Sequence, residues 1–478
     1  MDFQKIVSFV QRKYGKGVYD ADLCARMKTW WAWYTNNVPE FQTMRISNGL
    51  TTPQRKIYTL GMAKRVCEDW ASTLLNDSFK ITVNSSSSKS SVFIQGSKGE
   101  GGVLGSNNFR EMMSEAIELM CALGTYASVI NLSNTLVDSN GVIVPNKSAK
   151  INIDWFDAGH IIPLSFKNRI IDEAAFVTEF TVADKTYYLV SAHIKENDMY
   201  VIYNDVLSDS YETVSNFDGV LPMVKTLSSS PFFFIMRTNI VNNVSRRVPM
   251  GVSIFGNAID NLMACDTVYD SCVRDVVTGQ RIVMMNKCLL TTDQQGNPIV
   301  PQDVKQSYMQ FFGDDAASDI KEYIKEFAPK LNTEDLDKEL QNQLNMLSSK
   351  CGLGTKYYNF SMSSGVTATE YNGERNDMVR NATKMSSAIA KVVRDMVKKL
   401  LEVGHDVLGM PVDKNAKIDV AISDGFVESD ESLREQDRQD VRDGLMSKVE
   451  YRVKWYGETE AEAEAKLLKI SGQTNYSK

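Results

Sequence analysis

The residues from Thr367 to about Val403 form a run in which only Gly373 opposes an α-helix. A continuous helix over this run would be about 55 Å long at 1.5 Å per residue, with Gly373 as the candidate for a kink. A second run begins at Val252, where apolar residues recur at steps of three and four and predict a helix of about 25 residues, or about 38 Å. Long helices separated by loops are typical of an elongated assembly subunit rather than of a compact enzyme.

The first half of the chain alternates between helical and β-rich patterns. Apolar spacing predicts helices over 4–14, 53–75 and 109–127, whereas the Ser- and Gly-rich residues 84–108 are typical of a flexible surface loop. From about 128 to 236, short runs with a period near two predict a mostly antiparallel β region.

The second half contributes smaller elements between and after the long helices, so the expected fold class is mixed α+β. Residues 424–470 are charged and predicted to be mostly helical. Thr333 is a suitable N-cap for the helix that it begins. The expected elements are strands over 281–290 and 417–422 and helices over 319–327 and 333–349.

Length and charge limit what this chain can be. Its 478 residues predict roughly two to four structural units, and its 43% hydrophobic and 24% charged residues predict folded cores. The net charge of −7 argues against a protein that coats nucleic acid. Residues 424–464 contain 13 acidic and 6 basic residues, a net of −7 that equals the whole-chain value. The acidity is therefore local.

The cysteine pattern and the lack of long apolar runs indicate a compartment. The seven cysteines form no CxxC pair and their number is odd, which is typical of reduced thiols. No stretch approaches the ~18 apolar residues that a transmembrane helix needs. Residues 1–5 lack the layout of a secretory signal. We expect a soluble protein that is made in a cytoplasm and has no membrane partner.

The motifs of common enzyme classes are absent from the sequence. The three histidines, His160, His193 and His405, are far apart and do not form an HExxH pair. The sequence contains no GxxxxGK(S/T) phosphate loop and no GxSxG nucleophile elbow. We therefore expect no catalytic, cofactor-binding or metal-binding residues, no cofactor, and a protein that is not an enzyme.

Four segments, taken in order, resemble the portal proteins of tailed double-stranded-DNA bacteriophages of the siphovirus type. Together they cover nearly the whole chain, although each one alone is a weak signal. They are MAKRVCEDWA at 62–71 with the upstream Trp33-Tyr34, PMGVSIFGNAID at 249–260, SSGVTATE at 363–370, and GLMSK at 444–448 with YGETEAEA at 456–463.

This resemblance implies a ring, typically a dodecamer, at one vertex of the capsid, in the virion after assembly in the host cytoplasm. Genomic double-stranded DNA would pass through its channel without sequence specificity, both during packaging and during ejection. The implied partners are the large terminase, the head-completion adaptor, and the major capsid and scaffolding proteins. The implied portal-type fold has an α/β wing, a two-helix stem, a small α/β clip, a long kinked helix and a helical crown.

The resemblance also implies domain bounds. The wing is expected over 1–250, with 370–423 returning to it, the first stem helix over 251–277, the clip over 278–331, the second stem helix over 332–352, the tunnel loop over 353–369, the long kinked helix over 367–404, and the crown with the C-terminal tail over 424–478.

Residues that face moving DNA should be small and uncharged or acidic, because each Lys or Arg bound to a phosphate would act as a brake. For the tunnel-loop tip the alternative is an ordinary loop before a helix, and for the stem carboxylates it is a solvated helix face. The candidates are Ser363, Ser364, Gly365 and Val366 at the tip of the tunnel loop, and Asp260, Asp266 and Asp270 on the first stem helix.

Two further groups follow from the same resemblance. The clip hairpin could equally be any surface hairpin, and the crown carboxylates would form a mouth to which DNA does not adhere. The candidates are Gln294, Gln295, Gly296 and Asn297 in the clip hairpin, and Glu428, Asp430, Glu431 and Glu435 in the crown.

Two other functions stay open at this point. One is an enzyme of phage DNA metabolism, and the other is a different head-tail connector or adaptor protein, which the length of the chain disfavours. An aromatic cluster is also open between a subunit contact and packing inside the wing. It consists of Trp30, Trp31, Trp33 and Tyr34.

Overall fold

The computed structural model divides into two compact units, Met1–Ile422 and Ser423–Lys478, which we describe separately. The structure describes residues 1–45, 54–76, 79–85, 88–97, 101–215, 217–279, 282–286, 294–295, 308–312, 324–327, 330–359, 368–422, 430–456 and 458–473.

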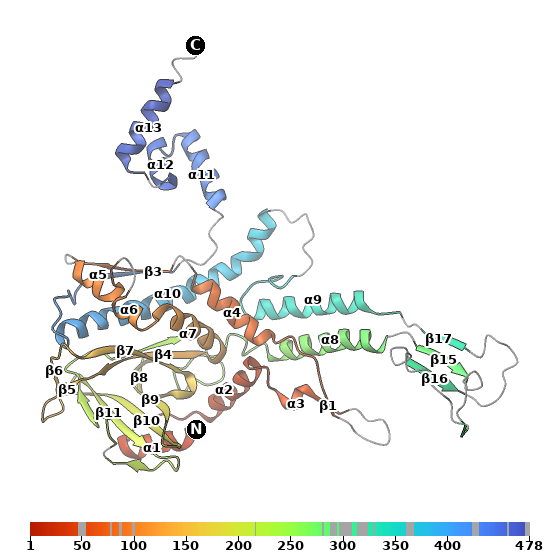
Figure 1. The fold of residues 1–478 in the computed structure, drawn as a ribbon, viewed down its shortest axis with the longest axis horizontal. Coiled ribbons are helices and arrows are strands. Elements are labelled where there is room, and N and C mark those ends of the chain that lie inside the picture. Colours follow the sequence, from red (N-terminus) through yellow and green to blue (C-terminus); the bar gives the residue numbers. More distant parts are fainter. Residues whose placement is uncertain are drawn as a thin grey trace. The chain divides into compact units, whose positions relative to one another are not determined.

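The first unit combines helices with several antiparallel sheets, in agreement with the mixed class expected from the sequence (Figure 1). Its helices are α1 (Phe3–Tyr14), α2 (Ala21–Tyr34), α3 (Pro39–Gln42), α4 (Met62–Leu74), α5 (Ser88–Gln95), α6 (Gly102–Ser106), α7 (Phe109–Leu123), the 3₁₀ turn η1 (Ala158–His160), α8 (Ile259–Thr278), α9 (Thr333–Lys350) and α10 (Ala368–Asp406). Its strands are β1 (Thr43–Arg45), β2 (Gln54–Lys56), β3 (Lys80–Asn84), β4 (Thr125–Ser133), β5 (Leu136–Val137), β6 (Ile143–Val144), β7 (Lys150–Asp157), β8 (Ile161–Lys167), β9 (Ile170–Val182), β10 (Lys185–Glu196), β11 (Met199–Leu207), β12 (Thr213–Val214), β13 (Met223–Lys225), β14 (Phe233–Arg237), β15 (Ile282–Asn286), β16 (Tyr308–Phe312), β17 (Ile324–Phe327) and β18 (Lys417–Ala421).

A three-stranded sheet in the order β14-β4-β7 forms the centre of the first unit. The helix α7 packs on β4 and β7, and α10 packs on β14. The contact faces are apolar. Met113, Ile117 and Met120 of α7 are fully buried, as is Leu400 of α10. Burial of this kind stabilises each large side chain by about 1.5–3 kcal/mol.

A larger antiparallel sheet in the order β12-β11-β10-β9-β8, with β13 paired to β11, lies beside this centre. It confirms the antiparallel β region expected between about 128 and 236. The helix α1 covers part of it, as predicted from the apolar spacing, and buries Ile6 and Val10 against Val190 and Leu207. Asp2 caps the start of α1 by accepting from the Lys5 amide, and Gly15 ends it at φ 66°.

The helix predicted over 53–75 begins later than expected. Residues 54–56 form β2, which pairs with β1, and α4 begins only after Gly61, whose φ is 65°. That left-handed conformation favours glycine and prevents a continuous helix. The reason lies outside the segment, because carboxylates of α8 accept the backbone amides of Tyr58 and Leu60.

Two other expectations need correction. The described part of 84–108 is not a loop throughout, since α5 and α6 form there and bury Ile94 and Leu104. The helix predicted over 109–127 ends at Leu123, because Gly124 turns the chain at φ 85° into β4. A short apolar run can serve a helix or a strand, and the partner strands decide which.

The long helix α10 runs for 39 residues, as the unbroken helical pattern predicts. It is continuous across Gly373, and Figure 1 shows that its N-terminal part (cyan) runs in a different direction from the rest. The expected strand after it is present as β18, which pairs with β3.

The second unit contains α11 (Asp430–Asp443), α12 (Lys448–Tyr456) and α13 (Glu460–Gln473), which confirms the predicted helical character. Polar contacts hold it together. Asp437 accepts from the Trp455 indole and pairs with Lys454, both at 2.6 Å, and Glu458 receives both nitrogens of Arg452 at 2.9 Å.

Candidate functional site

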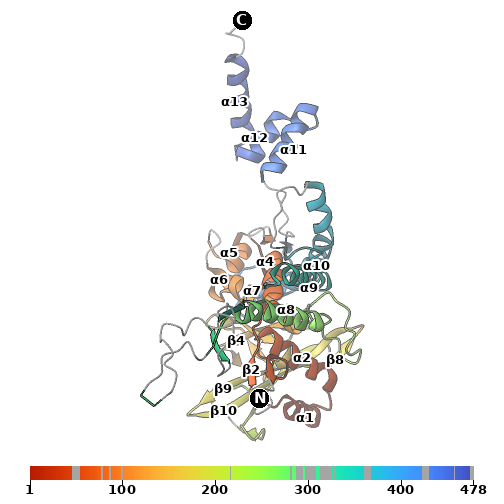
Figure 2. The same ribbon diagram turned by 90° about the vertical axis from the view of Figure 1, so that its right-hand side faces the viewer.

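The helices α8 and α9 pack side by side and lead to a separate small sheet in the order β16-β15-β17 (Figure 1). The strands β15 and β16 are parallel, and β15 and β17 are antiparallel. The helix expected over 319–327 is therefore wrong in its described part, because residues 324–327 pair with β15 as β17. Figure 2 views the helix pair from the side of this sheet.

The start of α8 and the cap of α9 differ from the predictions. The helix α8 begins at Ile259 rather than near Val252, and residues 251–258 form a turn between irregular stretches. The helix α9 begins at Thr333 as expected, but Asn332 occupies the N-cap position and Thr333 does not. The Asn332 amide donates to Asp275 Oδ2 at 2.8 Å, which joins the start of α9 to the end of α8.

The segment before α8 crosses the end of α7 at very close range. A Cβ atom on Gly251 would lie 2.0 Å from the carbonyl oxygen of Gly124, and one on Gly124 would lie 2.5 Å from Gly251 C and Val252 N. Only glycine at both positions allows the two backbones to approach this closely. The Gly251 amide donates to Thr125 Oγ1 at 2.8 Å, and the Ile254 amide donates to the Cys121 carbonyl at 2.8 Å. This crossing fixes where α8 starts.

Two of the three carboxylates proposed for the channel are engaged inside the subunit. Asp270 accepts both terminal nitrogens of Arg55, at 2.7 and 2.6 Å, and the Tyr58 amide at 3.0 Å. Asp266 accepts the Leu60 amide at 2.8 Å. Both are buried, whereas Asp260 in the first turn of α8 is exposed.

Burial and pairing act on these two carboxylates in opposite directions. Burial raises the pKa of Asp266 to about 6, although the Leu60 amide lowers it in part. The hydrogen bonds from Arg55 lower the pKa of Asp270 despite burial. These carboxylates hold the segment 55–60 on the helix pair, which leaves Asp260 as the exposed member of the three.

The other end of the pair is tied to α4 and α10. The Trp70 indole donates to the Cys351 carbonyl at 3.0 Å, and the Tyr358 hydroxyl donates to Asp69 Oδ2 at 2.8 Å. The Asn381 amide group of α10 donates to the Gly352 carbonyl at 3.1 Å. Cys351 and Gly352 directly precede the predicted tunnel loop and Tyr358 lies in its first part, so these bonds hold the chain where it leaves α9.

The remaining predicted site residues divide between described and undescribed parts of the chain. Gln294 and Gln295 lie in an exposed turn, and Asp430, Glu431 and Glu435 lie on α11. The other candidates lie outside the described residues. They are Ser363, Ser364, Gly365 and Val366 of the tunnel loop, Gly296 and Asn297 of the clip hairpin, and Glu428 of the crown.

The aromatic cluster packs mainly inside the subunit. Trp30 and Trp33 are buried, and the Tyr34 hydroxyl donates to Glu118 at 2.6 Å. Trp31 is 45% exposed and is the one member of the cluster that presents a large surface to solvent.

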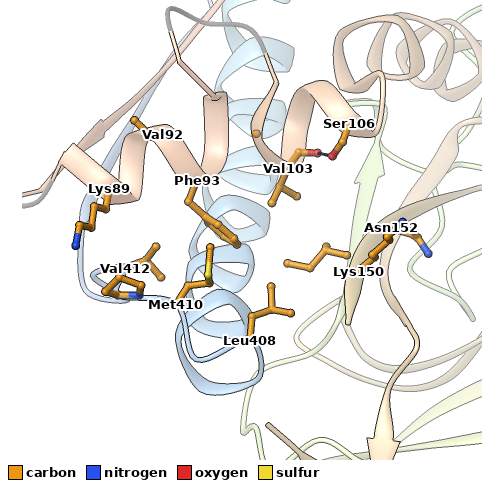
Figure 3. A pocket seen from close by; sticks show the side chains of 13 residues that line it. Lys89, Val92, Phe93, Val103, Ser106, Lys150, Asn152, Leu408, Met410 and Val412 are labelled. Atoms are coloured by element: carbon orange, nitrogen blue, oxygen red, sulfur yellow. Dashed lines mark hydrogen bonds between the residues drawn. The ribbon is translucent and has the colours of Figure 1, made fainter. Parts of the chain in front are cut away.

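A cavity of about 730 Å³ lies between α5, α6 and the chain that follows α10 (Figure 3). Phe93, Val103, Leu408 and Met410 line it. Phe93 approaches α10 so closely that a Cβ on Gly404 would lie 2.6 Å from its ring. The lining is mostly apolar and contains no arrangement of acid, base and nucleophile.

One Ser–Lys contact invites comparison with a catalytic dyad. Lys399 is buried and donates to Ser228 Oγ at 2.6 Å and to Glu402 at 2.9 Å. Burial lowers the pKa of Lys399, but the Glu402 carboxylate opposes this, and the Ser228 hydroxyl donates to Glu402 at 2.6 Å. A serine nucleophile needs a neutral lysine as its base. The carboxylate stabilises the ammonium instead, so this cluster ties α10 to the chain near Ser228.

In the described part of the chain, no group of three His, Cys, Asp or Glu side chains is arranged to hold a metal ion. Within the same residues, no helix is long and apolar enough to cross a membrane.

The body, the helix pair with its small sheet and the long helix α10 are the main parts of the first unit. The family model described as "Phage portal protein, SPP1 Gp6-like" matches residues 20–475. The chain therefore belongs to the SPP1 Gp6-like family of phage portal proteins, as the resemblance predicted.

Solved structures also include chains that resemble this one. The chain is similar to a chain of a solved structure titled "Neck of native GTA particle computed with C12 symmetry", with 8% identity and a TM-score of 0.43. The alignment covers 92% of this chain and 94% of the other. No curated protein matches this chain.

The contacts that build the helix pair were not predicted from the sequence. The bridge from Arg55 to Asp270 joins residues 215 positions apart, and the Trp70 contact with Cys351 joins residues 281 apart. Gly251 could have been singled out from the sequence, because it lies in the 249–260 segment that supported the resemblance. No local pattern pointed to Arg55.

Proposed function

We propose that this protein forms a ring at a unique capsid vertex and serves as the conduit through which genomic double-stranded DNA is packaged and ejected. The observation that carries the proposal is the portal family match across nearly the whole chain. The helix pair is consistent with it, since long helices that lead to a small separate domain can frame a channel and reach a docking surface.

The proposed parts follow the expected order along the chain. The body with β18 and most of α10 is the wing, α8 and α9 are the stem, and the sheet β16-β15-β17 belongs to the clip. The second unit is the crown. The clip is the proposed docking site for the large terminase and later for the head-completion adaptor, and Gln294 and Gln295 belong to its exposed surface.

DNA would meet mainly residues that cannot grip phosphate. Those proposed are the tunnel-loop tip at 363–366 and Asp260 on α8. The crown is proposed as the mouth of the channel. Asp437 and Glu458 of this unit are paired with Lys454 and Arg452. The carboxylates proposed to repel DNA are Glu428, Asp430, Glu431 and Glu435.

The experiment is electron microscopy and native mass measurement of the purified protein, followed by a packaging assay. We expect rings, predominantly dodecamers, with a channel wide enough for duplex DNA. Capsids assembled without the protein should fail to protect DNA from nuclease, and supplying the protein should restore protection. A monomer or dimer that persists across concentrations and salts would contradict the proposal.

A further inference from the structure

One face of α10 is exposed and carries an unusual number of cations. Arg380, Lys384, Lys391 and Lys398 are exposed and lie four, seven and seven residues apart, so they follow one side of the helix. From Arg380 to Lys398 this side rises through 18 steps of 1.5 Å, or about 27 Å. Asp395 lies among these cations, and Arg380 pairs with Asp377 at 2.8 Å. The opposite side packs into the body.

A groove runs beside this face. A cavity of about 920 Å³ lies between α10, β14 and the chain that follows β14, and a hollow of about 570 Å³ adjoins the N-terminal part of the same helix face. Both are lined by Asn239. We call these two hollows together the basic groove.

The lining of the larger cavity is strongly positive. It has six cationic side chains against the two carboxylates Asp395 and Glu402, a net of +4. Lys399 is paired with Glu402 at 2.9 Å and Lys414 with Asp406 at 3.3 Å. The other four have no carboxylate partner within the described part of the chain. They are Arg169, Arg237, Lys391 and Lys398.

Arg237 makes the charge imbalance costly. It is half-buried, and its terminal nitrogen donates to the Pro249 carbonyl at 2.5 Å. Burial lowers its pKa, and the positive charge of Arg169 lowers it further. A buried guanidinium is normally paired with an anion. An incoming carboxylate or phosphate would offset the cost of burying the Arg237 charge and the repulsion between the two arginines.

The groove also has apolar walls and an apolar rim. Phe233, Ile235 and Ile389 line it, and Val241 and Ile170 at its edge are 80% and 63% exposed. Phe233 and Ile389 are already buried in the subunit, so the apolar surface left to cover is that of Val241 and Ile170. The phosphates on the outside of a DNA duplex would meet the charges but would not bury these two side chains. A protein segment with both acidic and apolar side chains would do both, as is typical of protein interfaces.

We propose that the basic groove binds an acidic and apolar segment of a second copy of this chain, the neighbouring subunit of the ring. Charge complementarity supports this occupant, because a chain of net −7 whose groove lining is +4 carries −11 on the rest of its residues, of which −7 lies in residues 424–464. A ring also needs two different faces of each subunit to meet. The inference rests on the proposed function in that it assumes a ring.

The first test is charge reversal in the groove. The double variant Lys391→Glu/Lys398→Glu should show at least a tenfold lower fraction of rings at equal concentration, with unchanged circular dichroism and melting temperature. The matched control, Lys147→Glu/Lys185→Glu, makes the same change in net charge at exposed sites outside the groove and should assemble normally.

The second test identifies what occupies the groove. A photo-crosslinking amino acid at Val241 should yield a covalent dimer whose linked peptide contains Asp or Glu, whereas one at the exposed Leu136 should not. Crosslinking to a short DNA duplex in intact rings, with ring formation by the double variant unchanged, would overturn the proposal in favour of DNA. Normal rings without a crosslink would overturn it and leave the portal function standing. A wild-type protein that forms no ring would contradict both.

Discussion

At the scale of single residues, buried titratable groups show where the body is sensitive to pH. His193 lies between the rings of Phe176 and Phe233, both at right angles to it, and its Nδ1 atom is buried without a hydrogen-bond partner. Burial lowers its pKa to about 3 from an ordinary value of 6.5. Because the folded state excludes the proton, this residue's contribution is complete above pH 6.5 and is lost as the pH falls below it.

The resulting prediction concerns stability in mild acid. Between pH 6.5 and 4.5 the wild-type protein should lose about 2 kcal/mol through His193, because the slope reaches 1.36 kcal/mol per pH unit only once the unfolded imidazole is fully protonated. The variant His193→Phe should lack this loss. Melting temperatures measured across the pH range test it, and an identical decline in both proteins would show that His193 is not responsible.

The stability that Asp266 contributes changes with pH in the opposite direction. Its pKa is raised to about 6 by burial, so the stability that it contributes is complete below its unfolded pKa of 3.8 and is lost as the pH rises through 6. The variant Asp266→Asn retains an oxygen that can accept the Leu60 amide but cannot ionise. We expect it to gain about 2 kcal/mol relative to wild type at pH 8 compared with pH 4.5.

The control for this prediction is Asp266→Ala, which removes the acceptor as well as the charge. It should be destabilised at both pH values, because the partly buried Leu60 amide would lose its partner at a cost of about 1–3 kcal/mol. If Asp266→Asn changed the melting temperature equally at both pH values, the buried carboxylate would not be titrating in the folded protein.

At the scale of elements, close backbone crossings position the helices that matter for function. The Gly124–Gly251 crossing is the clearest example, since it determines how the chain enters α8. We predict that Gly251→Ala costs about 3 kcal/mol or more, because its Cβ would meet backbone atoms that cannot move aside as a side chain can. Thermal melting and the yield of soluble protein would measure the loss.

The matched control is Gly105→Ala, in α6. A Cβ there meets nothing within 4 Å, and alanine favours a helix over glycine, so this variant should be neutral or slightly stabilising. If Gly251→Ala were as well tolerated as Gly105→Ala, the crossing could not be what fixes the start of α8.

The elements also differ in how well the sequence predicted them. Long periodic runs such as α10, α9 and α1 were predicted within a few residues, because their own apolar spacing determines them. Element ends set by distant partners were missed: residues 54–60 are extended because α8 carboxylates take their amides, and 324–327 form a strand because β15 pairs with them.

At the scale of the whole molecule, the family could be predicted from the sequence, but most of the candidate site could not. The resemblance rested on four weak sequence segments that occur in the expected order along the chain, so no single motif had to be strong. The inward-facing roles of Asp266 and Asp270 could not be inferred, because the sequence pattern of a helix does not show whether a carboxylate faces solvent or pairs with an arginine of the same subunit. Only the fold brings Arg55 to Asp270.

The last prediction concerns the path of DNA through the ring. In a dodecamer, one added cation per tunnel loop becomes a collar of cations around the duplex, and each phosphate contact must break for the DNA to advance. We predict that Gly365→Arg leaves ring assembly intact but strongly reduces the amount of nuclease-protected DNA per capsid. Gly365→Ser, which stays small and uncharged, should package normally. Because α9 is held by Trp70 and Tyr358 where the chain leaves it, the substitution should not disturb the stem. Normal packaging by the arginine variant would remove 363–366 from the DNA path while leaving the ring itself unaffected.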